Sequence, residues 1–324
     1  MSSPVIDGNK VVLLGAAGTG TAFHIAARLR AVWGSAVRII GIDINPKNLV
    51  TTSLLCDAFY QVPYASEDGF TDVIARIARD EGVTVYVPLL NQEIAAAMGL
   101  GERGAPDELD VWVTPEMARI ACDKHYQAEW LAELSLPVPE TATDIAELRS
   151  GQWFMKPLDG TGSAGALALT AEHIDNLTEQ DLQENLVQEL CIGPEVTVDS
   201  FYDAGQSFGR ALCRERLETK SGVCTKARTF KDDQLSEYAA VLGAALEQRG
   251  SICFQVMQCR GEWVITDLNV RPGAGTAISS AVGFDLVPAG FAARWGLPYD
   301  EFFSGWQSDV EHFVTRQYSE FVMS

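Results

Sequence analysis

Residues Trp153-Phe-Met-Lys-Pro157 are followed by Asp159-Gly-Thr-Gly-Ser-Ala-Gly165 and then by Ala166 to Leu169. Two apolar stretches separated by a run of glycines predict two strands joined by a glycine-rich hairpin. Because glycine has no side chain, its backbone N–H groups can approach phosphate oxygens closely, and Lys156 adds a positive charge three residues before the loop. The segment therefore predicts a phosphate-binding hairpin, and an ordinary hairpin with a solvated lysine is an equal alternative.

The next strands carry two acids. Leu186 to Leu190 predicts a strand that holds Glu189 near its end, and Glu195 begins another strand that runs to Phe201. Strand backbone can bind the edge of an adenine, and a carboxylate can accept hydrogen bonds from ribose hydroxyls. Taken alone, a pair of solvated acids at strand ends explains this segment better. Whether it belongs to a nucleoside site therefore depends on the other segments of the chain.

A denser set of polar residues belongs to a second predicted hairpin, from Ser251 to Leu268, and to the residues just after it. Asp267 and Asn269 are two positions apart and share one face of a strand, while Gln255 lies on the preceding strand. Oxygen ligands of this kind, completed by water and phosphate, are what Mg²⁺ takes when it binds with ATP. Arg271 lies on the same face and can pair bidentately with a carboxylate or an acyl phosphate. A polar strand face explains any one of these residues, whereas the whole set favours a magnesium site.

The N-terminal part of the chain alternates strands and helices. Val11 to Leu14 is an apolar run that enters Gly15-Ala-Ala-Gly18-Thr-Gly20, after which apolar residues recur at helical spacing. Val37 to Ile42 predicts a second buried strand, and Val83 to Val87 a third, after the amphipathic stretch Phe70 to Arg79. This alternation predicts a parallel sheet with helices on its faces.

Beyond that sheet the sequence changes character. Thr114-Pro115-Glu116 predicts the start of a helix with a capping residue and a proline at its first position, and a new unit is expected near Cys122. Leu136-Pro-Val-Pro139 predicts a stiff linker. Further predicted elements are a strand over Phe208 to Leu217, a helix over Tyr238 to Gln248 and a short closing segment over Ala289 to Ser324.

Composition narrows the function classes. Twenty-four basic against 44 acidic residues give a formal net charge of −20, which argues against nucleic acid and anionic membranes as partners. The seven cysteines are odd in number and scattered, which predicts reduced thiols and gives a structural zinc site little support. No segment reads as a leader or a membrane span, so a cytoplasmic protein is expected.

Several segments in this order resemble the ATP-grasp superfamily, and most closely its branch that resembles the large subunit of carbamoyl phosphate synthase. The first part of the chain, including Asp57 to Pro63, resembles the pre-ATP-grasp domain of that branch. The segments that carry the resemblance further on are Asp123-Lys124, Leu136 to Thr141, Phe154-Met-Lys-Pro157 with its glycine loop, Val187-Gln-Glu189, Gly193-Pro-Glu195 and Asp267-Leu-Asn-Val-Arg271.

The resemblance implies an α/β fold with an α+β C-terminal part. A Rossmann-like pre-ATP-grasp domain over residues 1–121 would precede a two-lobed ATP-grasp fold, with a small lobe over 122–193 and a large lobe over 194–324. It also implies a ligase that uses ATP and Mg²⁺ to activate a carboxylate as an acyl phosphate for attack by an amine. The expected partners are small-molecule carboxylate and amine substrates, with a homodimer as an open alternative to a monomer.

The resemblance also assigns roles to residues. Lys124 and Lys156 would contact the ATP phosphates under a flap formed by Gly160, Thr161, Gly162, Ser163 and Gly165. Adenine would lie against Glu189, Leu190 and Cys191, and ribose against Glu195. Gln255, Asp267 and Asn269 would coordinate Mg²⁺, and Arg271 would stabilise the transferred phosphoryl group or the bound carboxylate. The sequence departs from the family in having Asp267 in place of the usual Glu and Asn-Val-Arg in place of Asn-Pro-Arg.

One further cluster is a candidate for catalysis. Arg214, Arg216 and Glu218 alternate along a predicted strand and would share one face, with Lys226 downstream. Such a face suits an anionic acceptor or the γ-phosphate. A salt-bridge ladder on the surface is an equal alternative.

Two other functions compete with the ligase. The turn from Gly15 to Gly20, with Asp43 at the end of the next strand, suggests a nicotinamide-dependent oxidoreductase, although the spacing differs from GxGxxG. A non-catalytic nucleotide-binding protein is the other alternative. The presence of Lys156, Asp267 and Arg271 argues against it, because a decayed site would be expected to lose its metal ligands first.

Overall fold

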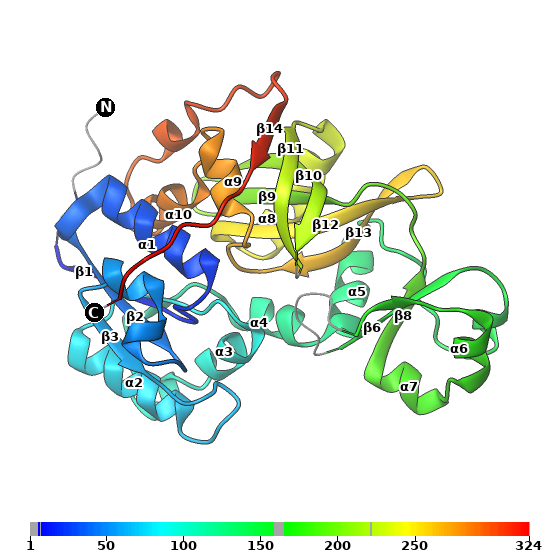
Figure 1. The fold of residues 1–324 in the computed structure, drawn as a ribbon, viewed down its shortest axis with the longest axis horizontal. Helices are drawn as coiled ribbons and strands as arrows, with labels where there is room; N and C mark the ends of the chain where they lie inside the picture. The colour runs from blue at the N-terminus through cyan, green and yellow to red at the C-terminus, as the bar shows by residue number, and fades with distance from the viewer. Residues whose placement is uncertain (1–5, 7, 159–164, 221, 324) are drawn as a thin grey trace.

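The structure is a computed structural model that describes residues 6, 8–158, 165–220 and 222–323. Within them the chain forms a parallel sheet, a small antiparallel sheet and a large antiparallel sheet, in that order along the sequence (Figure 1). The mixed α/β class expected from the sequence is confirmed. The boundaries at 121/122 and 193/194 stay predictions, although each sheet falls within one of the three predicted segments.

The N-terminal sheet is parallel throughout and has the order β3-β2-β1-β4-β5, as at the start of Rossmann-type sheets. Successive residues of β1 enter different cores: Val12 packs with the residues of α1, and Val11 with those of α2. A strand covered on both faces is apolar at every position, which explains the sequence of β1. The elements are β1 (Lys10–Leu14), α1 (Gly20–Trp33), β2 (Val37–Asp43), β3 (Ala58–Gln61), α2 (Phe70–Glu81), β4 (Val85–Val87), α3 (Asn91–Ala97) and β5 (Asp110–Val111).

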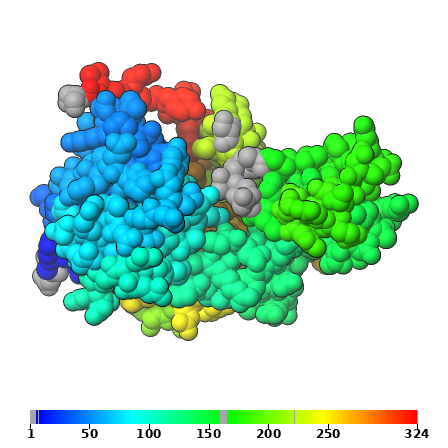
Figure 2. Space-filling model, turned by 90° about the horizontal axis from the view of Figure 1, so that it is seen from below, coloured from blue at the N-terminus to red at the C-terminus, as the bar shows by residue number. Residues whose placement is uncertain are grey.

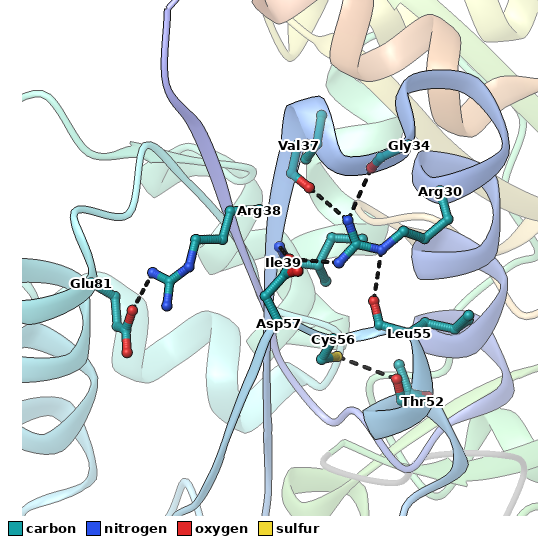
Figure 3. A network of polar contacts seen from close by, with 10 residues as sticks. All are labelled: Arg30, Gly34, Val37, Arg38, Ile39, Thr52, Leu55, Cys56, Asp57 and Glu81. Carbon is teal, nitrogen blue, oxygen red and sulfur yellow. Dashed lines mark hydrogen bonds and ion pairs between the residues drawn. The ribbon is translucent and has the colours of Figure 1, made fainter.

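Arg30 fixes α1 against the edge of this sheet (Figure 3). Its guanidinium donates to the carbonyls of Leu55, Gly34 and Val37 at 2.8–2.9 Å and pairs with Asp57. Asp57 in turn accepts from the backbone N–H of Ile39 at 2.7 Å. Asp57, which begins one of the segments that resemble the pre-ATP-grasp domain, therefore has a structural contact in this chain.

Two helices lead out of the parallel sheet to the small lobe. The Thr114 hydroxyl accepts from the N–H of Met117 at 3.3 Å and begins α4 (Pro115–Cys122), as the sequence predicts. Asp123 caps α5 (Lys124–Glu133) in the same way. The lobe projects from one end of the molecule (Figure 2), and its elements are β6 (Trp153–Pro157), β7 (Leu167–Ala168), α6 (Ala171–Asn176), α7 (Glu179–Glu184) and β8 (Asn185–Glu189), in the sheet order β7-β6-β8.

The large sheet is antiparallel and has the order β13-β12-β9-β10-β11-β14. Two of its strands, β11 and β14, were not predicted from the sequence. The last one lies in the segment expected only to close the chain, and that segment also holds most of α10. The elements are β9 (Val196–Asp203), β10 (Phe208–Lys220), β11 (Val223–Phe230), α8 (Asp233–Ala245), β12 (Arg249–Cys259), β13 (Glu262–Asn269), α9 (Thr276–Ala281), α10 (Leu286–Arg294) and β14 (His312–Thr315).

The helix predicted over Tyr238 to Gln248 begins five residues earlier than expected, at Asp233. Asp232 sets this start, because its side chain accepts from the N–H of Leu235 at 2.9 Å. In the described part of the chain, no helix combines the length and apolarity needed to cross a lipid bilayer.

The parallel sheet and the large sheet share one core. Buried residues of α1, of α10 and of strand β12 belong to the same cluster. An ion pair joins Arg28 on α1 to Asp285 at the start of α10, with Nη2 and Oδ2 2.6 Å apart. The N-terminal domain is thereby held against the large lobe, and the functional site has a fixed wall on that side.

Candidate functional site

A cavity of about 300 Å³ lies between the small lobe and the large sheet. Its walls come from α5, β6, the end of β8, β12 and β13, so distant parts of the sequence meet there. The predicted site residues that line it are Lys124, Lys156, Glu189, Leu190, Cys191, Glu195, Gln255, Asp267, Asn269 and Arg271.

Two lysines reach this cavity from different elements. Lys124, the first residue of α5, donates from Nζ to the carbonyl oxygen of Pro157 at 2.9 Å. Lys156, on β6, donates to the carbonyl oxygen of Thr266 at 2.6 Å and so spans from the small lobe to β13. Burial lowers the pKa of Lys156, and the carboxylate of Asp267 opposes that shift. The Lys156 ammonium group therefore lies on the side of the cavity formed by Thr266 and Asp267 of β13.

The end of β8 forms another wall. The carboxylate of Glu189 is held by Arg260, whose Nε lies 2.9 Å from Oε1, and this hydrogen bond lowers the pKa of Glu189. The N–H groups of Glu189 and Leu190 donate to the carbonyls of Glu140 and Gln152, each at 2.8 Å. Because these N–H groups and this carboxylate already have partners, a bound base would need other hydrogen-bonding groups at the end of β8.

Apolar side chains complete that wall, and the sequence analysis did not single them out. Phe154, Met257 and Leu268 line the cavity together with Leu190. Flat apolar walls with a few polar groups are typical of small-molecule sites. The sequence offered one signal for these residues, because they lie on predicted strands close to Lys156 and Asp267. Which strands face each other across the cavity, however, follows only from the fold.

The polar residues Asp267 and Asn269 of β13 lie opposite β12, as the predicted hairpin requires. Gln255 pairs with Asp267 in the antiparallel register, and Asn269 Nδ2 donates to Asp267 Oδ2 at 2.7 Å. Gln255, however, lies between two other groups: with its amide oriented to satisfy both, Nε2 lies 3.1 Å from Glu195 Oε1, and Oε1 lies 2.9 Å from Arg216 Nη1. Asp267 and Asn269 thus keep oxygens available, whereas Gln255 is engaged by Glu195 and Arg216.

These oxygens fit a magnesium ion bound together with a nucleotide. Mg²⁺ is usually held by one or two carboxylates while phosphate and water supply the remaining oxygens. Among the residues that the structure describes, no group of three or more His, Cys, Asp or Glu side chains could hold a metal alone. A metal at Asp267 and Asn269 would therefore depend on the oxygens of a bound phosphate.

Gln127 fixes this part of β13, and the sequence analysis missed it. Its side chain donates to the carbonyl of Leu268 and accepts from the N–H of the same residue, both at 2.9 Å. Gln127 lies three positions after Lys124, on the same face of α5. That helical spacing was a readable signal, and the contact holds the lysine and the acids in register.

The predicted cationic strand lies outside the cavity, and its ladder is broken. Arg214 is buried in an ion pair with Asp199, where the side chains are 4% and 0% exposed. Arg216 pairs with Glu195, and Lys226 pairs with Glu218 at 2.8 Å on the surface. A register irregularity between Arg216 and Glu218 interrupts the alternation that placed them on one face. None of the three cationic residues lines the cavity.

The glycine loop can be placed only in part. Gly160, Thr161, Gly162 and Ser163, predicted to form a flap over phosphates, lie outside the described residues. Gly165 is described: it has φ +77°, and a Cβ there would lie 3.0 Å from Pro157 Cγ. That positive φ explains a glycine at this position, directly beside the cavity-lining Ala166.

The N-terminal glycine turn is filled by the protein's own acids. Glu93 accepts from the N–H of Ala16 at 2.8 Å, and Asp43 accepts from the N–H of Gly18 at 2.6 Å. A Cβ at Gly15 would lie 2.4 Å from Glu93 Oε2, so the glycine makes room for a carboxylate. These contacts give no support to the oxidoreductase alternative.

Comparison with known proteins gives a family match to the part of the chain that supplies most of the cavity lining. The family model described as "ATP-grasp domain" matches residues 121–275, and a search of curated proteins found no match. N5-carboxyaminoimidazole ribonucleotide synthetase from Thermotoga maritima is 17% identical with a TM-score of 0.67, covering 90% of this chain and 77% of that one. Biotin carboxylase from Campylobacter jejuni is 14% identical with a TM-score of 0.71, covering 91% and 73%.

A third similar structure is a complex with nucleotide, magnesium and bicarbonate. It is the biotin carboxylase domain dimer of the Hydrogenobacter thermophilus 2-oxoglutarate carboxylase, in complex with MgADP, ADP and bicarbonate. It is 12% identical to this chain with a TM-score of 0.70, and the alignment covers 88% of this chain and 69% of that one. At these identities the three similarities establish a shared fold.

Proposed function

The chain contains an ATP-grasp domain over residues 121–275, and from that premise we propose that it is a magnesium- and ATP-dependent ligase. It would convert a small carboxylate into an acyl phosphate and pass the acyl group to an amine, with release of ADP and phosphate. An amino acid or small peptide is the proposed carboxylate. The similar structure with MgADP and bicarbonate supports the assignment of nucleotide, metal and a small acid to this fold.

One observation carries the proposal. Lys156 reaches from the small lobe to the carbonyl of Thr266, the residue immediately before Asp267. A cation suited to phosphate and an acid suited to a metal therefore meet in one cavity, although they are more than 100 positions apart in the sequence. Phosphoryl transfer needs this combination, since its catalysis rests on positioning and on stabilising phosphoryl charge.

The residues divide the work along the cavity. The apolar wall at Phe154 and Met257 would hold the base, and Lys124 and Lys156 would hold the phosphates. Asp267 and Asn269 would hold Mg²⁺, which when bound neutralises charge on the phosphate oxygens. Arg271, whose Nε is buried with no hydrogen-bond partner among the described residues, would pair with the carboxylate or the acyl phosphate.

Removal of water is the second contribution of this chain. The reacting end of the cavity lies between Asn269, Arg271 and the N-terminal residues Asn91 and Ala121. An acyl phosphate hydrolyses readily when water reaches it, so side chains that keep water away from this group would favour attack by the amine. The N-terminal domain would therefore act as a wall of the substrate site, while its glycine turn is held by Glu93 and Asp43.

The test has two stages. MgATP analogues should raise the melting temperature of the protein, whereas NAD and NADP should leave it unchanged. Pairs of amino acids should then be screened for release of ADP and phosphate that requires both substrates. Nucleotide binding without substrate-dependent ADP release in any pair would favour the non-catalytic alternative, and stabilisation by NAD instead of ATP would refute the ligase.

A further inference from the structure

Most arginines of this acidic chain form an ion pair with a carboxylate. Among the described residues, six arginines have no carboxylate oxygen within 4.0 Å. Four of them, Arg76, Arg79, Arg119 and Arg149, are exposed at the surface, and the other two, Arg271 and Arg316, are partly buried. Placing a charge away from water without a counterion is costly. In a protein of net charge −20, two partly buried arginines without a carboxylate partner therefore suggest a site for an anionic ligand.

One loop connects these two arginines. Arg271 directly precedes the loop Pro272 to Gly275, and Arg316 donates from Nη2 to the carbonyl of Ala274 within it. The Arg214 guanidinium packs directly against this loop, since a Cβ at Gly275 would lie 1.8 Å from Arg214 Nη2. Arg214 is already neutralised by Asp199, so the carboxylate in this region is in use.

A histidine of the N-terminal domain lies near Arg316. His24, on α1, has its Nε2 buried with no hydrogen-bond partner among the described residues. Burial, with Arg28 and Arg316 nearby, lowers the pKa of His24 to about 4. Burial and the neighbouring Arg214 also lower the pKa of Arg316. A neutral imidazole with an unpartnered nitrogen and two guanidinium groups without a carboxylate are the groups that an anionic ligand would need.

The C-terminal segment brings Arg316 to this place. Strand β14 pairs with β11 at the edge of the large sheet, with Thr315 opposite Lys226. The chain then runs from that sheet to the N-terminal domain (Figure 1), where Phe321 packs on Phe23 of α1 with ring centroids 5.6 Å apart. Arg316 is therefore held between α1 and the loop after Arg271.

We propose that Arg316 and Arg271, with His24 beside them, form an anion subsite for the non-nucleotide substrate, which holds a carboxylate or a similar oxyanion next to the phosphoryl group. The inference rests on the proposed ligase function, because Arg271 lines the cavity, whereas Arg316 and His24 are not among its lining residues and would extend the site beyond it. It adds the C-terminal segment and α1 to the substrate site. It also predicts that the substrate carries a negatively charged group to which the guanidinium groups can form bidentate hydrogen bonds.

The test uses succinate as the probe and the full chain. Binding is followed by the melting temperature and by titration calorimetry for the wild type, Arg316→Gln and the matched control Arg76→Gln, which alters an exposed unpaired arginine. Arg316→Gln should raise the apparent dissociation constant of succinate about tenfold or more, since a hydrogen bond to a charged group is lost. Arg76→Gln should match the wild type, and Arg316→Lys should retain part of the affinity.

Nucleotide binding separates the remaining outcomes. MgADP and the imido analogue of MgATP should bind the wild type and Arg316→Gln equally. A loss confined to the imido analogue would assign Arg316 to the γ-phosphate and overturn the substrate subsite. Equal succinate affinity in the wild type and Arg316→Gln would overturn the subsite while leaving the ligase intact. Absence of any nucleotide binding in the wild type would instead count against the proposed function. If Arg316→Gln does not fold, the comparison of Arg316→Lys with the wild type decides, and equal affinity overturns the subsite.

Discussion

The turn at Gly15 to Gly20 and the cavity around Lys156 look alike in sequence, since both combine glycines with a strand end and nearby charge. In the structure they differ in what their donors contact. The N–H groups of Ala16 and Gly18 donate to Glu93 and Asp43, which are acids of the same domain. Lys156 donates to a backbone carbonyl, and Arg271 Nε has no partner among the described residues.

This difference distinguishes a turn whose amides are satisfied by the protein from the proposed ligand site. An acid inside a glycine turn satisfies its amides and repels phosphate. Burying a cation beside a cavity without an acidic partner is costly, unless an anionic ligand neutralises its charge. The glycines alone therefore did not distinguish the two segments, whereas the location of the carboxylates favours the cavity around Lys156 as the proposed nucleotide site.

The largest effect is expected at Asp267. Asp267→Asn should keep the fold and much of the nucleotide affinity but lower the rate of ADP release about 100-fold or more, because one formal charge is withdrawn from the metal. The variant should also need more Mg²⁺ for half-maximal rate. Asp267→Glu, which restores the acid usual in the family, should keep measurable activity with an altered metal preference. Unchanged activity and magnesium dependence in Asp267→Asn would remove the metal site.

Lys156 tests the cationic side of the comparison. Lys156→Ala should raise the Michaelis constant for ATP and lower turnover, together about 10- to 100-fold in kcat/KM, because a charge on the phosphates is lost. Lys47→Ala, at an exposed position, is the control. Wild-type kinetics in Lys156→Ala would exclude this lysine from the site.

Lys156 also predicts a pH dependence. Because burial lowers its pKa, the ammonium loses its proton at a lower pH than an exposed lysine does. Nucleotide affinity should therefore fall as the pH rises into the alkaline range in the wild type. In Lys156→Ala that part of the decline should be absent, and an identical pH profile of the nucleotide dissociation constant in both proteins would contradict the assignment.

Glu93 tests the other side. Its side chain is 4% exposed and accepts from the N–H groups of Ala16, Leu89 and Leu90. Glu93→Gln would replace one carboxylate oxygen, which accepts from backbone N–H groups, with an NH2 group that cannot accept. This change should lower the free energy of unfolding by about 1–2 kcal/mol. The dissociation constant of MgADP should stay unchanged, which urea denaturation and calorimetry would check. A loss of nucleotide affinity without a loss of stability would place the ligand at the glycine turn.

Glu93 carries a pH dependence of its own. Burial raises its pKa, so the ionised form is less favoured in the folded protein than in the unfolded chain. Its contribution to stability should be largest at low pH and should decline as the pH rises through the raised pKa. In Glu93→Gln this part of the stability profile should be missing.

The smallest effect is expected at Arg260, which grips Glu189 on the surface beside the cavity. Exposed ion pairs contribute little, so Arg260→Gln should change the dissociation constant of MgADP by less than about threefold. The pair lowers the pKa of Glu189, so any effect should be present at neutral pH and should vanish as the pH falls through that pKa. A tenfold loss of affinity would show that the Glu189 carboxylate positions the nucleotide.

Much of the fold could be predicted from local patterns. The alternation of β1, α1 and β2 and the hairpin of β12 and β13 are confirmed, because burial on both faces or on one face imposes a period on the sequence. Strand β14 could not be predicted, since four residues at the edge of a sheet bury little and their pairing with β11 joins positions over 80 residues apart. Arg214 was misplaced for a similar reason: alternation gives the face of a strand, but Asp199 on the neighbouring strand decides that it is buried and paired.

The sequence by itself determined which residues are chemically suited to phosphate and metal: Lys156, Asp267, Asn269 and Arg271 are notable for their type and spacing. Only the tertiary structure decided which charges are compensated. It closed the N-terminal turn with Glu93, engaged Gln255 through Arg216, and left Arg271 and Arg316 without acids among the described residues. The physical reason is that the cost of a buried charge depends on partners brought together across the whole chain, and no local pattern contains them.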